Sequence, residues 1–251
     1  MDRATPTPKA REAFGRAKRI EEAYARRLRK VAAHVGDIVA GFDPDRWESA
    51  DAIGVILRQY ADTVLRPWAK AVAERMIADV NARDHREWMA ASRKIGKVLR
   101  NEIGATPVGD VVRARLAEQV NLITSLPKEA AERVHGLALE GITNGARASE
   151  IAKEILRTGE VTKSRATCIA RTEVGRTATE LTRARAESVG STHFVWRTSG
   201  DSDVREDHRK LNGKVFAWND PPVADGRTGA RALPGSIYNC RCYAAPVISN
   251  D

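Results

Sequence analysis

The residue types best suited to chemistry are gathered near the carboxyl end of the chain, where Asn239, Cys240, Arg241 and Cys242 follow one another and His208 lies upstream. Two cysteines one residue apart lie on the same side of an extended segment, because side chains alternate there. Such a pair can bind a metal together with other ligands, form a short strained disulfide, or fill space in a core. Which of these applies decides whether the end of the chain is held by a metal or by packing alone.

A short predicted helix positions the histidine. Asp203 and Glu206 form a capping-box pattern at its start. Val204, His208 and Leu211 then share one helical face, so His208 is expected to point toward the core between two apolar neighbours. A buried histidine needs hydrogen-bond partners for its ring nitrogens, and a backbone carbonyl is the simplest partner.

His208, Cys240 and Cys242 together offer the nitrogen and sulfur ligands that a structural zinc ion prefers. We therefore hypothesise a metal site formed by these three residues, with zinc as the cofactor. Their spacing differs from that of zinc fingers, and the candidates for a fourth ligand are Cys168, Asp201, Asp203 and His193. A structural role without metal and a bond between the two cysteines remain alternatives.

A nucleophilic cysteine is a further interpretation of the same residues. His208 would act as base toward Cys240 or Cys242, because the thiolate is the reactive form, and Asp203 would orient the histidine. The predicted inward direction of His208 argues against this interpretation, and no oxyanion-hole segment is apparent near Asn239. We therefore predict no catalytic residue.

The composition is that of a globular protein with a basic balance. The chain has 251 residues, 42% of them hydrophobic, and a net charge of +9, which suits an acidic surface or a phosphate backbone. Three cysteines are too few for a secreted disulfide framework. The amino terminus has no apolar signal segment, and no apolar run is long enough to span a membrane. We expect a soluble protein made in a reducing cytoplasm.

Long amphipathic helices are predicted for residues 1–104. Apolar residues at steps of three and four indicate a helix from about Lys9 to Val39, whose apolar seam is broken once, by Glu21. The next helix has an apolar face made of Trp47, Ile53, Leu57, Tyr60 and Val64, and Pro67 should break or kink it near Arg66. A third helical run reaches the loop that begins at Gly104.

Shorter helices are predicted for residues 105–190. They cover about 108–125, then 127–144 with Pro127 at its start, then 148–158, and finally Lys163 to Ser188 with Thr162 as its cap. The last helix carries a series of arginines expected mostly on its solvent face, where they could meet phosphates or an acidic protein: Arg165, Arg171, Arg176, Arg183 and Arg185.

Strands appear only after Gly190. Alternating residues predict strands at Thr192–Arg197, Lys214–Trp218 and Tyr243–Ile248, with a loop over 219–236 that is rich in glycine and proline. The predicted fold is mainly α, with long amino-terminal helices followed by a small α+β carboxy-terminal module that contains a short antiparallel sheet. Its domains are a long-helix bundle at 1–104, a helical part at 105–190 and the module at 191–251.

Several short motifs occur in one order: Ile169 to Glu173, Trp196-Arg197-Thr198 with Asp201, Arg205 and His208, Leu211-Asn212-Gly213, Pro234-Gly235, and Asn239 to Cys242 with Pro246. This set resembles the phage Mu F-like head-morphogenesis family, the minor head proteins of tailed bacteriophages. The matching positions span roughly 165–248. The resemblance implies that His208, Cys240 and Cys242 of this chain match the histidine and cysteine positions of the family.

The resemblance implies a minor capsid protein of the virion, present in few copies at the portal vertex of the phage head and assembled in the bacterial host cytoplasm. The implied roles are head assembly, DNA packaging or DNA ejection, with residues 1–104 as the portal-docking region. The implied partners are the portal protein, packaged double-stranded DNA, and the major capsid protein or scaffold, with no membrane. Some members carry an additional toxin or nuclease domain after the shared module, whereas this chain stops three residues past Ile248, so we expect no enzymatic activity.

Two alternatives from other functional classes remain. One is a nuclease or transferase toxin-like enzyme, with His208, Asp203 and Arg205 as its polar cluster. The other is a zinc-stabilised basic nucleic-acid-binding protein.

Overall fold

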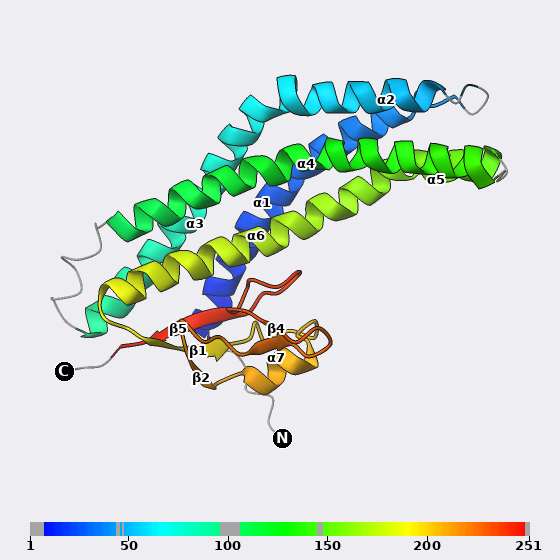
Figure 1. Ribbon diagram of the computed structural model, residues 1–251. Helices are drawn as coiled ribbons and strands as arrows, with labels where there is room; N and C mark the ends of the chain where they lie inside the picture. Colours follow the sequence, from blue (N-terminus) through cyan, green and yellow to red (C-terminus); the bar gives the residue numbers. More distant parts are fainter. Residues whose placement is uncertain (1–7, 44–45, 47, 96–105, 145–147, 249–251) are drawn as a thin grey trace. The chain divides into compact units, whose positions relative to one another are not determined.

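The computed structural model describes residues 8–43, 46, 48–95, 106–144 and 148–248. Seven α-helices, one π-helix and five strands follow one another in these residues (Figure 1): α1 (Pro8–Val39), α2 (Glu48–Gln59), the π-helical η1 (Tyr60–Leu65), α3 (Arg66–Ile95), α4 (Thr106–Asn144), α5 (Ala148–Leu156), α6 (Thr158–Ser188), β1 (His193–Arg197), α7 (Glu206–Leu211), β2 (Val215–Ala217), β3 (Val223–Asp225), β4 (Ala230–Arg231) and β5 (Tyr243–Val247). The predicted fold class is confirmed, because long helices precede a small antiparallel sheet at the carboxyl end.

The chain divides into two compact units, each assembled from separate stretches of sequence. One contains residues 1–22, 75–116 and 171–251, and the other contains 23–74 and 117–170. We call the first the site unit, because it holds His208 and both carboxy-terminal cysteines, and the second the helical unit. The helices α1, α3, α4 and α6 each contribute residues to both units. The division into domains at 104 and 190 stays a prediction.

The helical unit has a core of aliphatic side chains from α1, α2, α4 and α5. Its largest buried members include Val35, Leu57, Val134 and Ile155. A buried hydrogen bond of 2.8 Å from the Tyr24 hydroxyl to Gln119 Oε1 satisfies the polar atoms that this packing removes from water. No helix in the described residues is both long and apolar enough to cross a membrane.

Pro67 changes the helix that contains it without ending it. The chain stays helical from α2 through η1 into α3, and the π-helical turn directly precedes the proline, where a normal α-helical hydrogen bond would need the missing N–H. Figure 1 shows the change of direction between α2 and α3. Because a π-turn holds more residues per turn, Ala61 and Leu65 continue the buried face, and the prediction that Val64 belongs to it was wrong. Trp47 lies outside the described residues.

Pro127 lies inside one continuous helix, α4, so the two predicted helices at 108–125 and 127–144 are a single element. The hydroxyls of Thr124 and Ser125 donate to carbonyls of the preceding turn, at Val120 and Leu122. Neither hydroxyl reaches the Ile123 carbonyl, which is the one that Pro127 leaves without its usual N–H donor, and the helix nevertheless continues through the proline.

The helix α6 begins earlier than its predicted cap. Thr158 is its first residue, and the Thr162 hydroxyl donates to the Thr158 carbonyl from within the helix, so Thr162 is not a cap. Glycine makes this early start possible, because α6 and α1 approach closely there. A Cβ on Gly159 would lie 2.9 Å from the Cα of Gly36, which is closer than packed carbon atoms allow.

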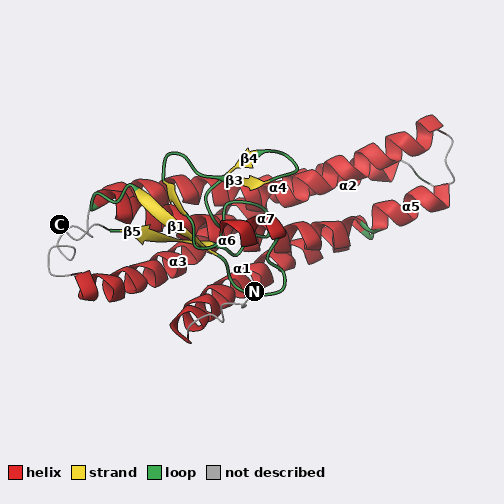
Figure 2. Cartoon of the chain, turned by 90° about the horizontal axis from the view of Figure 1, so that it is seen from below, coloured by secondary structure: helices red, strands yellow, loops and turns green. Residues whose placement is uncertain are grey.

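The site unit contains the sheet, in the order β2-β1-β5 with both pairs antiparallel. The central strand β1 lies beside β5, pairing Phe194 with Pro246 and Trp196 with Ala244 (Figure 2). All three predicted strands are therefore present, each shorter than predicted by at least one residue. Phe194, Trp196 and Trp218 are buried on one face and form the core of this unit with Trp88 of α3.

Two sequence interpretations in this unit were wrong. The predicted loop at 219–236 contains the antiparallel strands β3 and β4, which are too short to show alternation in the sequence. The capping box also fails, since α7 begins at Glu206 with no side-chain cap, and the Asp203 N–H instead donates to Asp201 within a local turn.

The arginines of α6 are bound to partners more than they face solvent. Arg185 is buried and pairs with Asp84 of α3, while its second nitrogen donates to Asn81 at 2.6 Å. Arg171 pairs with Glu21 of α1 at 3.1 Å. The expectation of a mostly solvent-facing series was therefore wrong, because period alone does not show that acidic side chains of other helices lie opposite these positions.

Candidate metal centre

His208 is held by α7 with its imidazole facing inward, as predicted. Its side chain is 2% exposed, and Val204 beside it is also buried. Nε2 lies 2.9 Å from the carbonyl oxygen of Ala224, which can only accept, so Nε2 carries the proton. The ring of Trp196 meets the imidazole edge-on at 5.3 Å. Nδ1 therefore carries the lone pair and is the nitrogen that could bind a metal ion.

Cys240 and Cys242 lie against this free nitrogen. Both are unbonded thiols, 4% and 5% exposed, and each Sγ lies 3.5 Å from His208 Nδ1. The three ligand atoms all lie within 4.8 Å of one another. The structure thus brings together the three residues that the sequence proposed, while the cysteine–cysteine bond considered as an alternative is not formed.

A tight turn presents the two thiols on the same side. Asn239 has a φ of 58°, in the left-handed region, and its N–H donates to the Thr172 hydroxyl of α6 at 3.2 Å. The turn also touches α6 at Gly175, where a Cβ would lie 3.0 Å from the Gly235 carbonyl oxygen and 3.3 Å from that of Cys240. A glycine in the helix is thus required for the cysteine turn to lie this close.

The pKa values of the two thiols shift in opposite directions. The hydrogen bond from Cys242 and the interaction with His208 lower the pKa of Cys240 to about 4, against the effect of burial. The same hydrogen bond and burial raise the pKa of Cys242. Burial lowers the pKa of His208, but the bond to Cys240 and the Ala224 carbonyl outweigh it, and the net pKa is raised. A thiolate beside an imidazole is the state in which such residues bind a metal.

Of the four candidates for a fourth ligand, two aspartates line a cavity next to the cluster, and the other two residues do not. Asp201 and Asp203 line a small cavity of about 30 Å³ together with His208 and both cysteines. His193 is exposed on β1, on the strand face opposite Trp196, and its Nδ1 bonds to Thr192. Cys168 belongs to the helical unit.

The three polar residues proposed for an enzyme, His208, Asp203 and Arg205, bind different partners. Asp203 pairs with Arg241 at 3.8 Å, and the imidazole is held by the Ala224 carbonyl instead, so Asp203 does not orient it. Arg205 donates to the carbonyl of Tyr238 at 2.7 Å, which is a structural role. Although all three residues line the same small cavity, the histidine is oriented by the Ala224 carbonyl.

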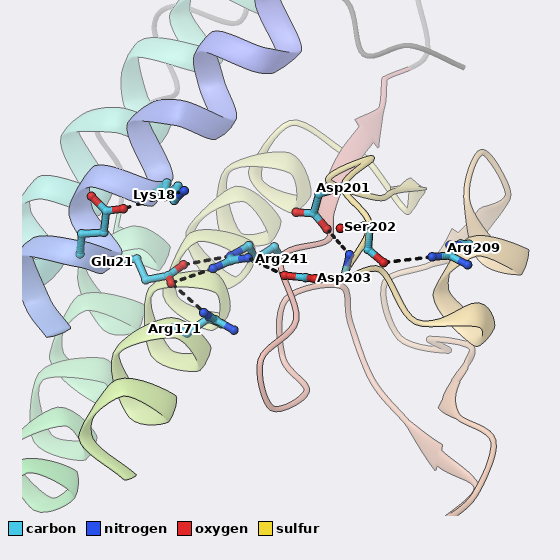
Figure 3. Close-up of polar contacts among 9 residues, drawn as sticks. Lys18, Glu21, Arg171, Asp201, Ser202, Asp203, Arg209 and Arg241 are labelled. Atoms are coloured by element: carbon cyan, nitrogen blue, oxygen red, sulfur yellow. Dashed lines mark hydrogen bonds and ion pairs between the residues drawn. The ribbon is translucent and has the colours of Figure 1, made fainter. Parts of the chain in front are cut away.

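Arg241 lies between the two cysteines and points away from them, and sequence reasoning assigned it no role. Its guanidinium makes two contacts with the Glu21 carboxylate of α1, at 3.2 and 3.3 Å, and Arg171 adds a third at 3.1 Å (Figure 3). The one signal for this clamp was the charged residue in the otherwise apolar seam of the first predicted helix. The charged residue in the seam, Glu21, did not indicate that its partner would be Arg241, which lies 220 positions away in the sequence.

The sequence is similar to those of several known proteins. The chain is 28% identical over 208 residues to an uncharacterized protein of Haemophilus influenzae, covering 81% of this chain and 44% of the relative. It is 26% identical over 163 residues to minor head protein GP7 of Bacillus phage SPP1, covering 59% of this chain and 52% of the relative. An uncharacterized protein of Methanocaldococcus jannaschii is 35% identical over 109 residues, which are 43% of this chain and 16% of that protein.

The chain therefore spans about half the length of the first two relatives and less of the third. No solved structure matches it significantly. Residues 132–245 match the family described as phage Mu protein F like protein, a stretch that includes α5, α6 and every residue of the histidine–cysteine cluster. The resemblance to the phage Mu F-like family seen in the sequence is thus confirmed over residues 132–245.

Proposed function

We propose that this protein is a structural minor head protein of a tailed phage that associates with the portal vertex and acts in head assembly, DNA packaging or DNA ejection. The observation that carries the proposal is the phage Mu F-like match at residues 132–245. The similarity to the SPP1 minor head protein over 59% of this chain supports it. In this proposal the protein resides in the phage head after assembly in the host cytoplasm.

The burial of the histidine–cysteine cluster supports a structural role over an enzymatic one. A nucleophilic thiol has to meet its substrate, whereas His208, Cys240 and Cys242 are all buried and the adjoining cavity has a volume of about 30 Å³. The imidazole N–H that would have to donate to an orienting carboxylate, at Nε2, donates instead to the Ala224 carbonyl. These contacts suit a rigid anchor for the surrounding strands.

The proposed partners are the portal protein, the packaged double-stranded DNA, and the major capsid protein or scaffold. The net charge of +9 favours contact with DNA phosphates. On α1, Arg26, Arg27 and Lys30 are exposed, whereas several α6 arginines are already paired. Any DNA contact through such side chains would weaken steeply as salt concentration rises.

The test is to locate the protein in assembled heads. A tagged full-length chain would be supplied during phage growth, the heads purified, and the tag found by gold labelling and electron microscopy. We expect label at a single vertex and co-purification with the portal ring. Absence from purified heads, or label spread evenly over the shell, would overturn the proposal.

The enzyme alternative is tested on the same preparation. We expect no cleavage of RNA or DNA above the level of a matched His208→Ala preparation. Cleavage that this substitution abolishes while the circular dichroism spectrum is retained would establish the alternative instead.

A further inference from the structure

We propose that His208, Cys240 and Cys242 bind one zinc ion, which holds the carboxy-terminal turn onto α7 and the sheet. One imidazole nitrogen and two sulfurs form a donor set that zinc prefers over the hard cations magnesium and calcium. The proposal stands independently of the head role, because it rests only on these residues and their surroundings.

The spacing of the donor atoms suits tetrahedral zinc. With zinc–nitrogen and zinc–sulfur bonds of roughly 2.1 and 2.3 Å, a tetrahedral centre places nitrogen and sulfur about 3.6 Å apart. The structure has Nδ1 at 3.5 Å from each sulfur. An ion can therefore bind with little movement of the three side chains.

The surroundings already orient the ligands as a metal requires. The Ala224 carbonyl accepts the Nε2–H of His208, which directs the Nδ1 lone pair at the sulfurs. The indole N–H of Trp196 is fully buried without a hydrogen-bond partner among the described residues, and the indole lies 5.3 Å from the His208 imidazole between ring centroids. A zinc-bound thiolate would accept this N–H, since coordinated sulfur keeps its negative charge.

The fourth ligand comes from the loop before α7. Asp201 is half-buried and lines the small cavity next to the cluster, while the more exposed Asp203 is bound to Arg241. A carboxylate oxygen from Asp201 would close the coordination shell, as structural zinc sites require. This needs a small movement of the loop, because the close group of ligand atoms contains only the histidine and the two cysteines.

The experiment uses the full-length chain, purified under reducing conditions without chelators. We expect elemental analysis to find about one zinc per chain. Cys240→Ser and His208→Ala should lose it, whereas Cys168→Ser, which removes the third cysteine from the other unit, should retain it. No bound zinc after reconstitution of the reduced protein, or an equal loss in Cys168→Ser, would overturn the proposal.

A second measurement avoids variants that fail to fold. The wild-type protein is loaded with cobalt, whose absorption reports the ligand type and geometry. We expect intense sulfur-to-cobalt charge-transfer bands and the visible bands of a tetrahedral centre. Pale octahedral cobalt without sulfur bands would overturn the site, as would an intact mass showing that native protein contains a disulfide.

The fourth ligand has its own matched pair of variants. Asp201→Asn should weaken zinc binding by about tenfold or more in a chelator competition, and Asp203→Asn should change it much less. Equal affinities of the two variants would overturn the assignment of Asp201.

Discussion

The clamp between Glu21 and Arg241 gives a sharp test of how α1 is tied to the cysteine turn. Glu21→Gln keeps the size of the side chain but removes the charge that two guanidinium groups share. The glutamine amide offers one oxygen and one N–H₂ group, so part of the bidentate contact becomes a donor facing a donor. Arg241 and Arg171 would then remain partly buried beside a neutral group.

The magnitude follows from burial. Exposed ion pairs contribute roughly 0.2–1 kcal/mol, while removing one partner of a buried pair costs about 3–5 kcal/mol. The Glu21 side chain is 13% exposed and that of Arg241 is 17%, so the pair lies nearer the buried case with some remaining solvation. We expect a loss of about 2–3 kcal/mol in the local stability of this contact.

Glu22→Gln is the matched control, since the side chain of this adjacent residue is 51% exposed and pairs with the exposed Lys18 at 4.0 Å. It should change stability by about 0.5 kcal/mol or less. The assay is amide hydrogen exchange of peptides from α1 and from the cysteine turn, which reports local opening. Glu21→Gln should speed exchange in both by about 30- to 140-fold relative to the wild type.

The reasoning is refuted if the two variants behave alike. Equal exchange in both would mean that the charges near Glu21 are screened as fully as those at the surface. Faster exchange in α1 alone would mean that the turn containing Arg241 does not depend on the helix.

Two further matched pairs test the helix contacts. Gly159→Ala should destabilise the helical unit by about 1–3 kcal/mol in chemical unfolding, because the added Cβ meets the backbone of α1. Gly136→Ala, which has open space around it, should instead stabilise the protein by about 0.5–1 kcal/mol. Stabilisation by both substitutions would contradict the close approach of the two helices. Arg115→Met should cost about 3 kcal/mol, at the low end for a buried pair, because Glu173 keeps the half-buried Arg176 at 3.6 Å. The exposed Arg113→Met on the same helix should cost about 1 kcal/mol or less. Equal midpoints of thermal unfolding would show that the buried pair adds nothing.

The sequence predicted the elements with the strongest local patterns. The first helix was placed within one residue at its start, because its apolar spacing continues over its whole length. His208 was expected to face inward with Val204, and it does, since a helical face depends only on spacing. The gathering of His208 with both cysteines was also proposed correctly, because the chemistry of the residue types narrowed the possible partners.

The errors came from one local signal that the helix overrides and from features that depend on distant residues. Pro127 was expected to start a helix, and it lies inside one. Arg185 was expected in solvent, and an acidic side chain of α3 buries it. The contact of Glu21 with Arg241 joins opposite ends of the chain, so no local pattern could reveal it.

The alternation of side chains in residues 240–242 makes this short segment unable to accept a change of length. Its outer residues, Cys240 and Cys242, belong to the aromatic core. Its middle residue, Arg241, points to Glu21 of α1 (Figure 3). Deleting or inserting a single residue here would exchange the two directions, placing a guanidinium among indole rings and a thiol opposite a carboxylate. Tags or linkers introduced into a protein of this kind should therefore avoid the segment, whereas point substitutions would disturb only one of its two sides.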